Sequence, residues 1–344
     1  MDQLELKVIQ VRKETQDAAT ILLKRSDGLP ILYEAGQFLT LLFSRNGQDL
    51  RRSYSLSSAP GIDEYTSITV KRIPNGEVSR WLLDTVQPGD QFLSLLPAGR
   101  FTLSTNSHAR RQFFFIAAGS GIIPVYSLIK KILVEEPLSE IILIYQNRRQ
   151  IDILFAEPLA LLQQTWPSRF ICINLLSQPE KPDNRPQRLN NSLLDRLVRY
   201  HLQIQRDQLF YLCGPGSFMR MAQFTLRLIG FAEDQIKKEN FTVGYIPPPP
   251  LISDYRTYEI IIHANQRLYR LHSTNQLNIL QAAMNNGIRL PYSCRSGRCS
   301  TCVSKLIKGK VIMSINEVLT EKDLEQGWIL TCVGYALSDI ELVI

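Results

Sequence analysis

The sequence lacks several features that assign a protein to a class at once. It has no uninterrupted apolar run long enough to cross a bilayer, because its most apolar window, residues 113–129, contains two glycines and a proline. The first 25 residues carry charges of both signs and no apolar core, so we expect no secretory leader. Internal repeats and low-complexity tracts are also absent. These absences favour a globular, cytoplasmic protein without membrane insertion.

The excess of one charge sign is modest. Lys and Arg number 39 against 32 Asp and Glu, which gives a net charge of +7. The basic residues are scattered through strand-like segments, with no recognition-helix or RNA-binding signature, so we expect no nucleic-acid partner. Such an excess is typical of a solvated surface or of a docking face for an acidic partner.

At 344 residues the chain is long enough for two or three domains. Residues 1–106 read as short strands punctuated by Gly, Pro, Asn and Asp, with one helix near 77–85, the pattern of an antiparallel barrel or sandwich. Residues 107–243 alternate apolar strands with helices, which predicts a doubly wound α/β domain with a parallel sheet. Residues 244–253 contain four consecutive prolines and predict a stiff linker. Residues 254–344 form a last domain that opens with two strands and a helix.

Cysteine is sparse, but four of the six cysteines lie in the last domain. Cys294, Cys299, Cys302 and Cys332 have the spacing C-x4-C-x2-C-x29-C, in which four thiolates of plant-type ferredoxins hold a [2Fe–2S] cluster. A disulfide is a weaker interpretation in a reducing compartment. A structural zinc site is the other alternative, although zinc sites usually pair two short cysteine knuckles and Cys332 stands alone.

The last domain as a whole resembles a plant-type ferredoxin, with a strand pair, a helix, the loop CRSGRCSTC and a late TC. The resemblance implies an α+β β-grasp fold and a [2Fe–2S] cluster. Plant ferredoxins are typically acidic, whereas residues 289–310 contain six basic residues and no acidic one. Arg295 and Arg298 are therefore candidates for docking an acidic acceptor protein. A solvated basic loop is the alternative.

An ordered set of short motifs marks the first domain: GQF at 36–38, RSYS at 52–55, NGEVS at 75–79 and LPAGRF at 96–101. The set resembles the flavin domain of the ferredoxin–NADP reductase-like superfamily, and the resemblance favours FAD over FMN. It implies flavin-binding roles for Arg52, Ser53, Tyr54, Ser55, Val70, Lys71, Gly76, Val78, Ser79 and Phe241.

The residue types in these motifs suit a flavin. Arg52 can pair with a pyrophosphate through two hydrogen bonds, which Lys cannot do. Tyr54 offers a flat face beside the flavin ring, and the Ser55 hydroxyl near flavin N5 makes Ser55 a catalytic candidate. Gly76 permits close backbone approach, and the N–H groups of the helix after it would face phosphate. Alternatively, Tyr54 is a strand-packing residue, Gly76 a turn residue and Phe241 an ordinary core residue.

The second domain carries two glycine motifs. AAGSGIIP at 117–124 lies between a strand and a helix, the context expected of a dinucleotide-binding turn. CGPGS at 213–217 ends another strand and matches the C-G-P element that lies beside the nicotinamide in the superfamily. NAD(P)H-binding roles follow for Gly119, Gly121, Ile122, Pro124, Arg148, Arg149, Cys213, Gly214 and Pro215. Cys213 is also a catalytic candidate, with a buried core thiol as the alternative.

Coenzyme preference depends on the segment after the second strand of this domain. NAD-preferring folds commonly place an acidic residue at the adenosine ribose. Here Arg148 and Arg149 come first and no acid precedes Asp152, so a 2′-phosphate would find guanidinium partners. The pattern favours NADPH over NADH, with an exposed basic turn as the alternative.

A flavin domain, a nicotinamide domain and a C-terminal ferredoxin, in this order, resemble the reductase components of multicomponent oxygenases. Residues 147–162 are similar to a stretch in the reductase subunit of phenylacetyl-CoA epoxidase (ring 1,2-epoxidase) complexes, which act in aromatic catabolism. We therefore predict an NAD(P)H:acceptor oxidoreductase that passes electrons through FAD and a [2Fe–2S] cluster, one at a time, to an oxygenase.

Three alternatives remain for the acceptor and the role. The chain is the reductase of another hydroxylase or desaturase, a diaphorase-like reductase of a stand-alone redox protein, or a non-catalytic redox sensor. The electron-transfer subunit of dihydroorotate dehydrogenase is set aside, because its last two cysteines are much closer together than Cys302 and Cys332.

Overall fold

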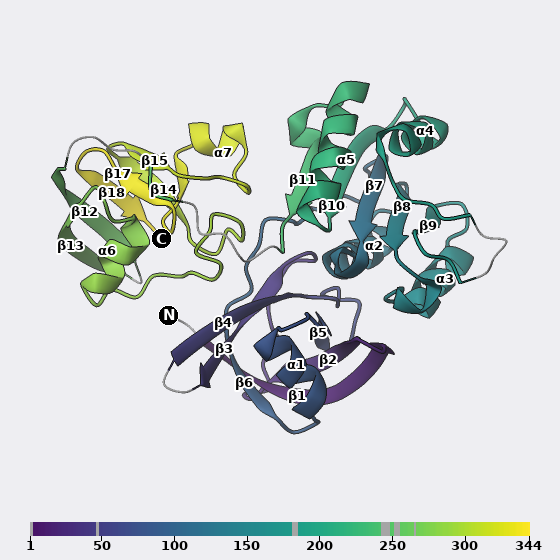
Figure 1. The fold of residues 1–344 in the computed structure, drawn as a ribbon, viewed down its shortest axis with the longest axis horizontal. Coiled ribbons are helices and arrows are strands. Elements are labelled where there is room, and N and C mark those ends of the chain that lie inside the picture. Colours follow the sequence, from purple (N-terminus) through teal and green to yellow (C-terminus); the bar gives the residue numbers. More distant parts are fainter. Residues whose placement is uncertain (1–2, 46–47, 181–184, 242–247, 251–254, 265) are drawn as a thin grey trace. The chain divides into compact units, whose positions relative to one another are not determined.

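The computed structural model describes residues 3–45, 48–180, 185–241, 248–250, 255–264 and 266–344. They form two compact units, Gln3–Glu239 and Asn240–Ile344 (Figure 1). Most of the predicted linker, 244–253, lies outside the described residues, as does the predicted domain end at residue 243. Within the described ranges, no helix is long and apolar enough to cross a membrane.

The first part of the larger unit is a closed antiparallel barrel. Its strands are β1 (Gln3–Thr15), β2 (Ala18–Arg25), β3 (Phe38–Arg45), β4 (Gln48–Ser55), β5 (Thr66–Lys71) and β6 (Gln91–Leu95), with α1 at Glu77–Thr85. They pair in the order β4-β3-β6-β1-β2-β5, and a bridge from Leu56 to Ile68 joins the two edges. Alternating apolar residues such as Leu4, Leu6 and Val8 fill the interior, as the period of a strand requires. The predicted barrel and its helix are confirmed.

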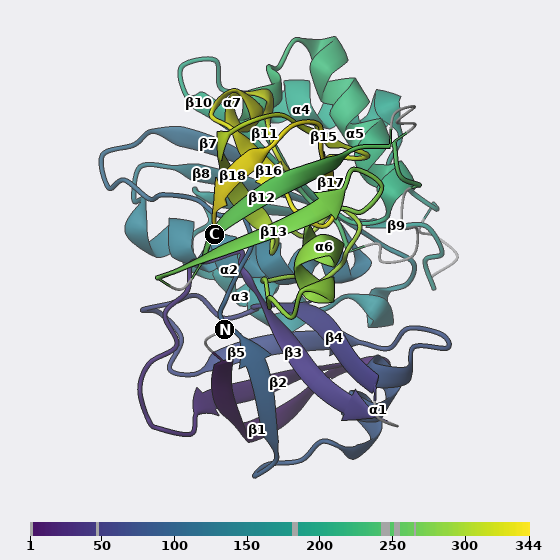
Figure 2. The ribbon, with the colours of Figure 1, turned by 90° about the vertical axis from the view of Figure 1, so that its left-hand side faces the viewer.

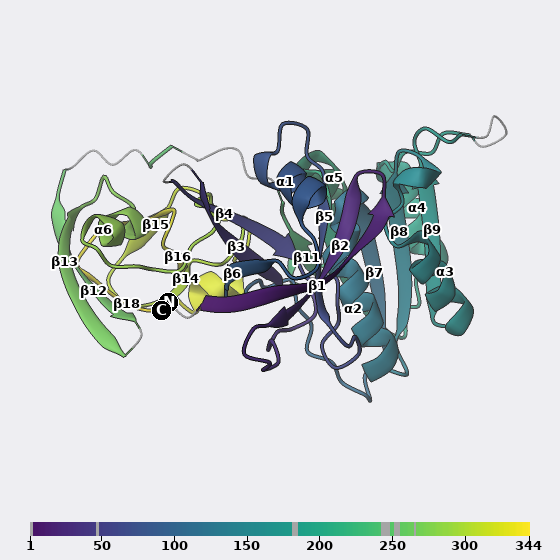
Figure 3. The same ribbon diagram turned by 90° about the horizontal axis from the view of Figure 1, so that it is seen from below.

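The second part of this unit is a parallel sheet covered on both faces. Its strands are β7 (Arg111–Ala118), β8 (Glu140–Asn147), β9 (Phe170–Leu176), β10 (Asp207–Cys213) and β11 (Ile236–Glu239). Its helices are α2 (Ile122–Glu135), α3 (Ala156–Thr165), α4 (Asn191–His201) and α5 (Gly216–Ile229), with short 3-10 turns at Gly119–Gly121, Gln150–Asp152 and Glu233–Gln235. Helices α2 and α3 cover one face of the sheet, and α4 and α5 cover the other (Figure 3). Phe113 and Phe115 share a core with α2 and α3, whereas Phe114 shares one with α4 and α5. This is the predicted doubly wound fold.

The strand order of this sheet is β11-β10-β7-β8-β9. The chain therefore winds outward in one direction from β7 to β9 and returns on the other side with β10. The order reverses between β7 and β10, and ligands of open α/β sheets bind beyond the carboxyl ends of the strands at such a reversal.

The smaller unit is a β-grasp domain. Its main sheet is ordered β13-β12-β18-β14-β16, from β12 (Thr257–Ala264), β13 (Arg267–Thr274), β14 (Val303–Lys308), β16 (Trp328–Leu330) and β18 (Ile340–Val343). A small sheet pairs β15 (Val311–Met313) with β17 (Gly334–Ala336), and α7 spans Glu321–Glu325. Helix α6 (Ile279–Asn285) lies beside β12 and β13 (Figure 2), and its apolar residues share the core with Ile260 and Leu342.

The helix predicted after the two opening strands of this domain spans only seven residues, Ile279–Asn285. The side chain of Asn278 accepts a hydrogen bond from the N–H of Gln281, so the helix begins after Asn278. Gly287, with φ 72°, terminates it in the left-handed conformation that glycine adopts without strain.

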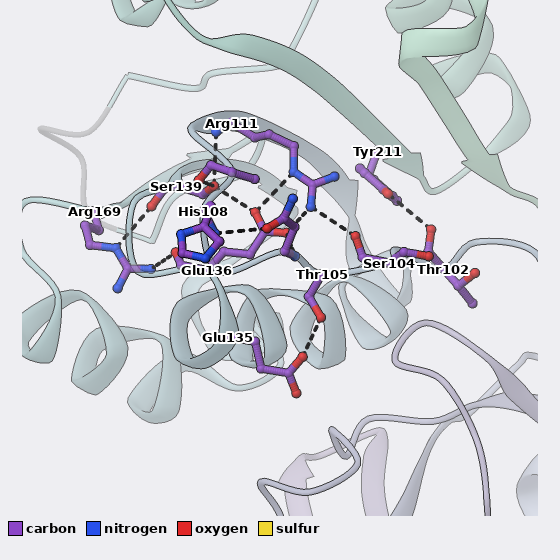
Figure 4. Close-up of polar contacts among 12 residues, drawn as sticks. Thr102, Ser104, Thr105, His108, Arg111, Glu135, Glu136, Ser139, Arg169 and Tyr211 are labelled. Carbon is purple, nitrogen blue, oxygen red and sulfur yellow. Dashed lines mark hydrogen bonds and ion pairs between the residues drawn. The ribbon is translucent and has the colours of Figure 1, made fainter.

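A buried ion pair holds the segment that connects the barrel to the parallel sheet (Figure 4). Glu136, just after α2, is fully buried and pairs with the guanidinium of Arg111, which also donates to the carbonyl of Ser104 at 3.0 Å. The same carboxylate accepts hydrogen bonds from the Ser139 hydroxyl at 2.7 Å and the Asn106 N–H at 3.1 Å. The buried carboxylate of Glu136 is thus satisfied by the connecting segment and by the turn before β8.

Arg169 closes the carboxyl end of α2 in the same network (Figure 4). Its guanidinium donates to the carbonyls of Leu133, Glu136 and Ser139 at 2.8 to 3.1 Å. Carbonyls at the end of a helix have no partner within it, and a cation there also complements the helix dipole. Partial burial lowers the pKa of Arg169.

Glu136→Gln is expected to lower the free energy of unfolding by about 3 kcal/mol, because it leaves the Arg111 guanidinium largely buried without an anion. Chemical denaturation followed by circular dichroism measures this. The matched control is Asp195→Asn on α4, whose pair with Arg199 is exposed and should contribute less than about 1 kcal/mol. Equal effects of the two substitutions would contradict the role assigned to Glu136.

Candidate functional site

Two glycine loops touch where the strand order reverses. A Cβ atom on Gly121 would lie 2.0 Å from the carbonyl oxygen of Cys213, and one on Gly214 would lie 3.0 Å from Cβ of Ala118. Gly121 therefore packs against the backbone of Cys213, and Gly214 packs against the side chain of Ala118, so neither position has room for a side chain of its own. Gly119 has φ 55° and turns the chain out of β7. The structure thus brings together the predicted residues Gly119, Gly121, Cys213 and Gly214.

Two helices begin at this reversal of strand order, where open α/β sheets bind their ligands in a crevice. Helix α2 starts at Ile122, which is fully buried, and Pro124 lies in its first turn, where its missing N–H costs nothing. Helix α5 starts after Pro215. Free N–H groups of first helical turns, together with the helix dipole, favour an anion such as a pyrophosphate.

Lys71 adds a positive charge from the barrel. Its Nζ atom lies 3.8 Å from the position that a Cβ on Gly119 would take. Lys71, predicted to bind the flavin, therefore lies beside the nucleotide loop at the start of α2. Lys71 also contributes to holding the pKa of Asp152 below its usual range, after Arg149 and the backbone.

The flavin motif runs along the end of β4. Arg52 is exposed and donates to the carbonyl of Arg51 at 2.8 Å, and the hydroxyl groups of Ser53 and Thr40 lie 2.9 Å apart. Tyr54 is half-buried against the barrel core, and burial raises its pKa. These residues lie on consecutive positions of one strand, next to β5 across the bridge from Leu56 to Ile68.

Three predicted flavin residues serve the scaffold through their side chains. Val70 and Val78 are buried in the barrel core. The Ser79 hydroxyl accepts a hydrogen bond from the N–H of Ile73 at 3.2 Å and donates to the carbonyl of Gly76 at 3.3 Å, which holds the turn before α1. A Cβ on Gly76 would lie 2.6 Å from this hydroxyl oxygen, so the turn requires glycine.

Ser55, Cys213 and Glu239 come together from three strands. The Ser55 hydroxyl lies 3.5 Å from Oε1 of Glu239, the last residue of β11, and Glu239 pairs in register with Cys213 on β10. Oε2 of Glu239 is shielded from solvent and has no hydrogen-bond partner among the described residues. Burial raises the pKa of Glu239 to about 8, although the nearby Ser55 hydroxyl opposes the shift, and burial raises the pKa of the Cys213 thiol strongly.

Glu239 is the functional candidate that sequence reasoning missed. Its only signal is an acidic residue at the carboxyl end of a strand that borders the crevice, in the stretch ENFTV. Phe241, from the same stretch, belongs to the smaller unit and is 37% exposed.

The two arginines after β8 differ in their contacts. Arg149 donates to both carboxylate oxygens of Asp152, at 2.9 and 3.1 Å, and this pair lowers the pKa of Asp152. Arg148 is exposed. The Tyr145 hydroxyl donates to the carbonyl of Gly119 at 3.0 Å, which ties β8 to the nucleotide loop. Both guanidinium groups are exposed, and Arg149 is the one that a carboxylate engages.

The four cysteines of the last domain lie close together as one group. The Sγ atoms of Cys302 and Cys332 are 3.2 Å apart, and the N–H of Cys294 lies 3.4 Å from Sγ of Cys299. Hydrogen bonds from the neighbouring thiols of Cys299 and Cys332 lower the pKa of Cys294, and the contacts with Cys294 and Cys302 raise that of Cys332. Four thiolates at this spacing need a compensating positive charge.

The loop around Cys294 supplies N–H groups to sulfur. The N–H groups of Ser296 and Arg298 each lie 3.4 Å from Sγ of Cys294. Three loop residues with positive φ, Arg295, Gly297 and Ser300, bend the backbone to make this possible. Bonds of this kind tune the potential of a bound cluster.

The cysteines fit a cluster that contains two iron atoms. Within the described ranges, no three His, Cys, Asp or Glu side chains are placed to ligate a single metal ion. The four thiols instead contact one another as one group, Cys302 with Cys332 and Cys294 with both Cys299 and Cys332, so four thiolates can hold one [2Fe–2S] cluster. Cys172 lies on β9 in the other unit, where burial raises its pKa to about 11.

The two loop arginines have different surroundings. The Arg298 guanidinium is largely buried, and its Nε lies 3.2 Å from Oε2 of Glu317. Arg295 is exposed and stacks over the ring of Tyr292, 4.3 Å from its centre. Of the two predicted docking residues, Arg295 is the one that presents its charge to solvent.

Comparison with known protein families assigns all three domains. Residues 5–103 match the oxidoreductase FAD-binding domain, residues 115–223 the oxidoreductase NAD-binding domain, and residues 262–337 the 2Fe-2S iron-sulfur cluster binding domain. The residues described above suit these groups: N–H groups and Lys71 for a dinucleotide, and paired thiols for the cluster. FAD, a [2Fe–2S] cluster and NAD(P)H are therefore the cofactors and the electron donor.

Curated relatives match over nearly the whole chain. The ferredoxin reductase component of 3-ketosteroid-9-alpha-monooxygenase from Mycolicibacterium smegmatis is 31% identical over 98% of this chain and 95% of its own. One component of the 1,2-phenylacetyl-CoA epoxidase of Escherichia coli is 31% identical over 97% of this chain and 95% of its own.

Among solved structures, phthalate dioxygenase reductase has the same fold, with a TM-score of 0.60 at 24% identity over 99% of this chain and 97% of that one. A type IV self-sufficient cytochrome P450 monooxygenase matches with a TM-score of 0.73 at 19% identity, over 99% of this chain and 40% of that one. With its three cofactor domains and its full-length relatives, the protein belongs to the family of FAD- and [2Fe–2S]-containing oxidoreductases that serve as reductase components of oxygenase systems.

Proposed function

We propose that this chain takes electrons from NADPH and delivers them singly to an acyl-CoA ring epoxidase in the cytoplasm, where phenylacetyl-CoA is the substrate. Electron entry is supported by the meeting of Ser55 from the flavin motif with Cys213 and Glu239 at the end of the nucleotide-binding sheet, and the acceptor by the 31% identity to the epoxidase component. A second candidate acceptor is a ketosteroid hydroxylase, because its reductase component is equally similar, at 31% identity.

The site residues have distinct tasks in this proposal. When bound, FAD accepts a hydride from the nicotinamide and releases its electrons one at a time. Arg52 and the first turn of α1 hold the flavin pyrophosphate, and Tyr54 lies along the flavin ring. The N–H groups at the start of α2, with Lys71, hold the pyrophosphate of the nucleotide. Arg148 binds the 2′-phosphate that distinguishes NADPH from NADH.

Ser55 and Glu239 are assigned to the flavin N5 side. A carboxyl group with a pKa of about 8 is neutral at physiological pH, so it adds no negative charge beside a flavin that is to accept a hydride. Cys213, in register with Glu239 on the neighbouring strand, contributes a neutral thiol. We assign residues 1–106, 107–243 and 254–344 to the three domains, with 244–253 as the linker.

Reconstitution tests the acceptor. We expect NADPH consumption to accelerate when the epoxidase oxygenase component and phenylacetyl-CoA are both added, and to remain at the background rate with either alone. Parallel assays use the ketosteroid oxygenase component with its steroid. If only the steroid system accelerated NADPH consumption, the ketosteroid hydroxylase would be the acceptor and not the epoxidase. If the protein reduced cytochrome c but neither oxygenase accelerated NADPH consumption, the diaphorase-like alternative would be favoured.

Cys332→Ser is expected to abolish the visible absorbance of the cluster, because one iron loses a thiolate. The variant should reduce ferricyanide with NADPH at the wild-type rate, since the flavin is untouched, but lose cytochrome c reduction. Cys172→Ser, in the other unit, is the control and should keep both activities. If Cys332→Ser retained cytochrome c reduction, the cluster would not be the exit route for electrons.

The pH dependence of flavin reduction tests Glu239. Because a hydride brings negative charge to the flavin, ionisation of Glu239 should slow its transfer, so the wild-type rate should fall as pH rises through about 8. Glu239→Gln cannot ionise, and its rate should stay flat from about pH 7 to about pH 9. Anaerobic stopped-flow measures both profiles. Ser55→Ala serves as the control, expected to be slower but to keep the inflection; identical profiles for the wild type and Glu239→Gln would refute the assignment.

Arg295→Gln is expected to weaken the dependence on ionic strength of electron transfer from the reduced cluster to the oxygenase. Exposed charges that steer association are screened by salt, so the wild-type rate should fall as salt rises. Arg270→Gln, on the edge strand β13, is the matched control, because Arg270 is also exposed. A wild-type rate that did not change with salt would exclude docking by Arg295.

A further inference from the structure

The segments that directly follow the two cofactor motifs meet through partly buried polar contacts. Residues 56–63 follow Ser55 of the flavin motif, and α2 follows the nucleotide loop. Lys130 of α2 forms an ion pair with Asp63, and Oδ2 of Asp63 also accepts a hydrogen bond from the N–H of Ala59 at 2.6 Å. One turn earlier on α2, the Ser127 hydroxyl donates to the carbonyl of Ser58 at 2.5 Å.

The α2 side of these contacts is shielded from water, whereas the Asp63 side chain is 34% exposed. Lys130 is only 9% exposed, and Ser58 and Ser127 are 1% and 0% exposed. The Lys130 ammonium also lies 4.4 Å from the ring centre of Tyr126. Burial lowers the pKa of Lys130, and the charge of Asp63 opposes that shift. A buried ammonium is costly without an anion, so this face of α2 is stable only when the Asp63 loop lies against it.

The loop is equally fixed to the barrel. The Ser58 hydroxyl accepts a hydrogen bond from the N–H of Ser67 at 2.8 Å and lies 2.6 Å from the Tyr33 hydroxyl. Ser57, its neighbour, contacts the hydroxyls of Ser67 and Thr69 at 2.9 Å. Movement of α2 relative to β4 and β5 would therefore break directional bonds at several points.

Apolar contacts between the two parts cannot supply the same constraint. Ala18, Ala35 and Phe101 of the barrel side share a core with α2, but apolar contacts have no preferred direction and tolerate sliding. Charge-assisted hydrogen bonds do have a preferred geometry. Asp63–Lys130 and Ser58–Ser127 therefore define the register of α2 on the barrel.

We propose that the Asp63–Lys130 ion pair, with the Ser58–Ser127 hydrogen bond, is a positioning latch that sets the approach of the nicotinamide to the flavin. This inference rests on the proposed function. On the barrel side, the latch begins at Ser58, three residues after Ser55. On the other side, its residues lie on α2, the helix that starts at the nucleotide loop. Few residues therefore separate the latch from either cofactor motif. Hydride transfer requires reacting atoms about 3 to 3.5 Å apart, and a displacement of about 1 Å costs about 100-fold in rate.

Anaerobic stopped-flow reduction of the FAD-loaded protein by NADPH tests the latch. Asp63→Asn and Lys130→Met are each expected to lower the limiting rate of flavin reduction by about tenfold or more, with the dissociation constant for NADPH unchanged. The long-wavelength charge-transfer absorbance between nicotinamide and flavin should weaken in both variants. Lys130→Arg, which keeps the positive charge, should recover part of the rate lost in Lys130→Met.

Matched variants separate positioning from stability. Asp195→Asn removes a carboxylate from an exposed ion pair on α4 and should leave the rate and the charge-transfer band unchanged. If the ion-pair variants do not fold with FAD, Ser127→Ala removes a single hydrogen bond of the latch and should still lower the rate. Wild-type rates and charge-transfer absorbance in folded variants would overturn the latch. A wild-type protein whose flavin neither NADPH nor NADH reduces would instead overturn the proposed function.

Discussion

The contact of two backbone loops at the reversal of strand order is the constraint on which the rest of the site depends. Gly121 and Gly214 leave no room for side chains between the ends of β7 and β10, so the helices that follow both strands begin at the same crevice. Anion binding at those helix ends, the position of Cys213 at the crevice and its register with Glu239 all follow from this close approach. The barrel contributes Lys71 and Ser55 to the same place.

The two units differ in how their sites accommodate negative charge. At the crevice, Glu239 and Cys213 are kept neutral by burial, which suits a site that receives a hydride. In the smaller unit, four thiols are gathered by a loop whose N–H groups point at sulfur, an arrangement that suits a group with positively charged irons. The crevice thus disfavours additional negative charge, whereas the cluster site of the smaller unit is built from cysteines that bind iron as negatively charged thiolates.

Pairing decides which basic residues are available to ligands. Arg149 is engaged by Asp152, and Arg298 by Glu317, so each guanidinium helps to hold its own loop. Lys130 is engaged by Asp63 and joins the two halves of the larger unit. Arg148 and Arg295 are exposed and suit an incoming phosphate or carboxylate. A net charge of +7 therefore says little about function until the ion pairs are known.

Local patterns alone determined much of this protein: the barrel, the doubly wound sheet, the helix at 77–85 and the cysteine spacing all follow from periodicity, turn residues and short motifs. Each of these patterns lies within a short stretch of sequence, where the side chains themselves favour a helix, a strand or a turn. Tertiary structure alone decided that Glu239 lies beside Ser55, that Lys71 lies beside Gly119, and that Ser79 and Val78 support the scaffold. These residues are far apart in the chain or turn inward for packing reasons, because burial and partner choice are properties of the assembled core and not of any short stretch of sequence.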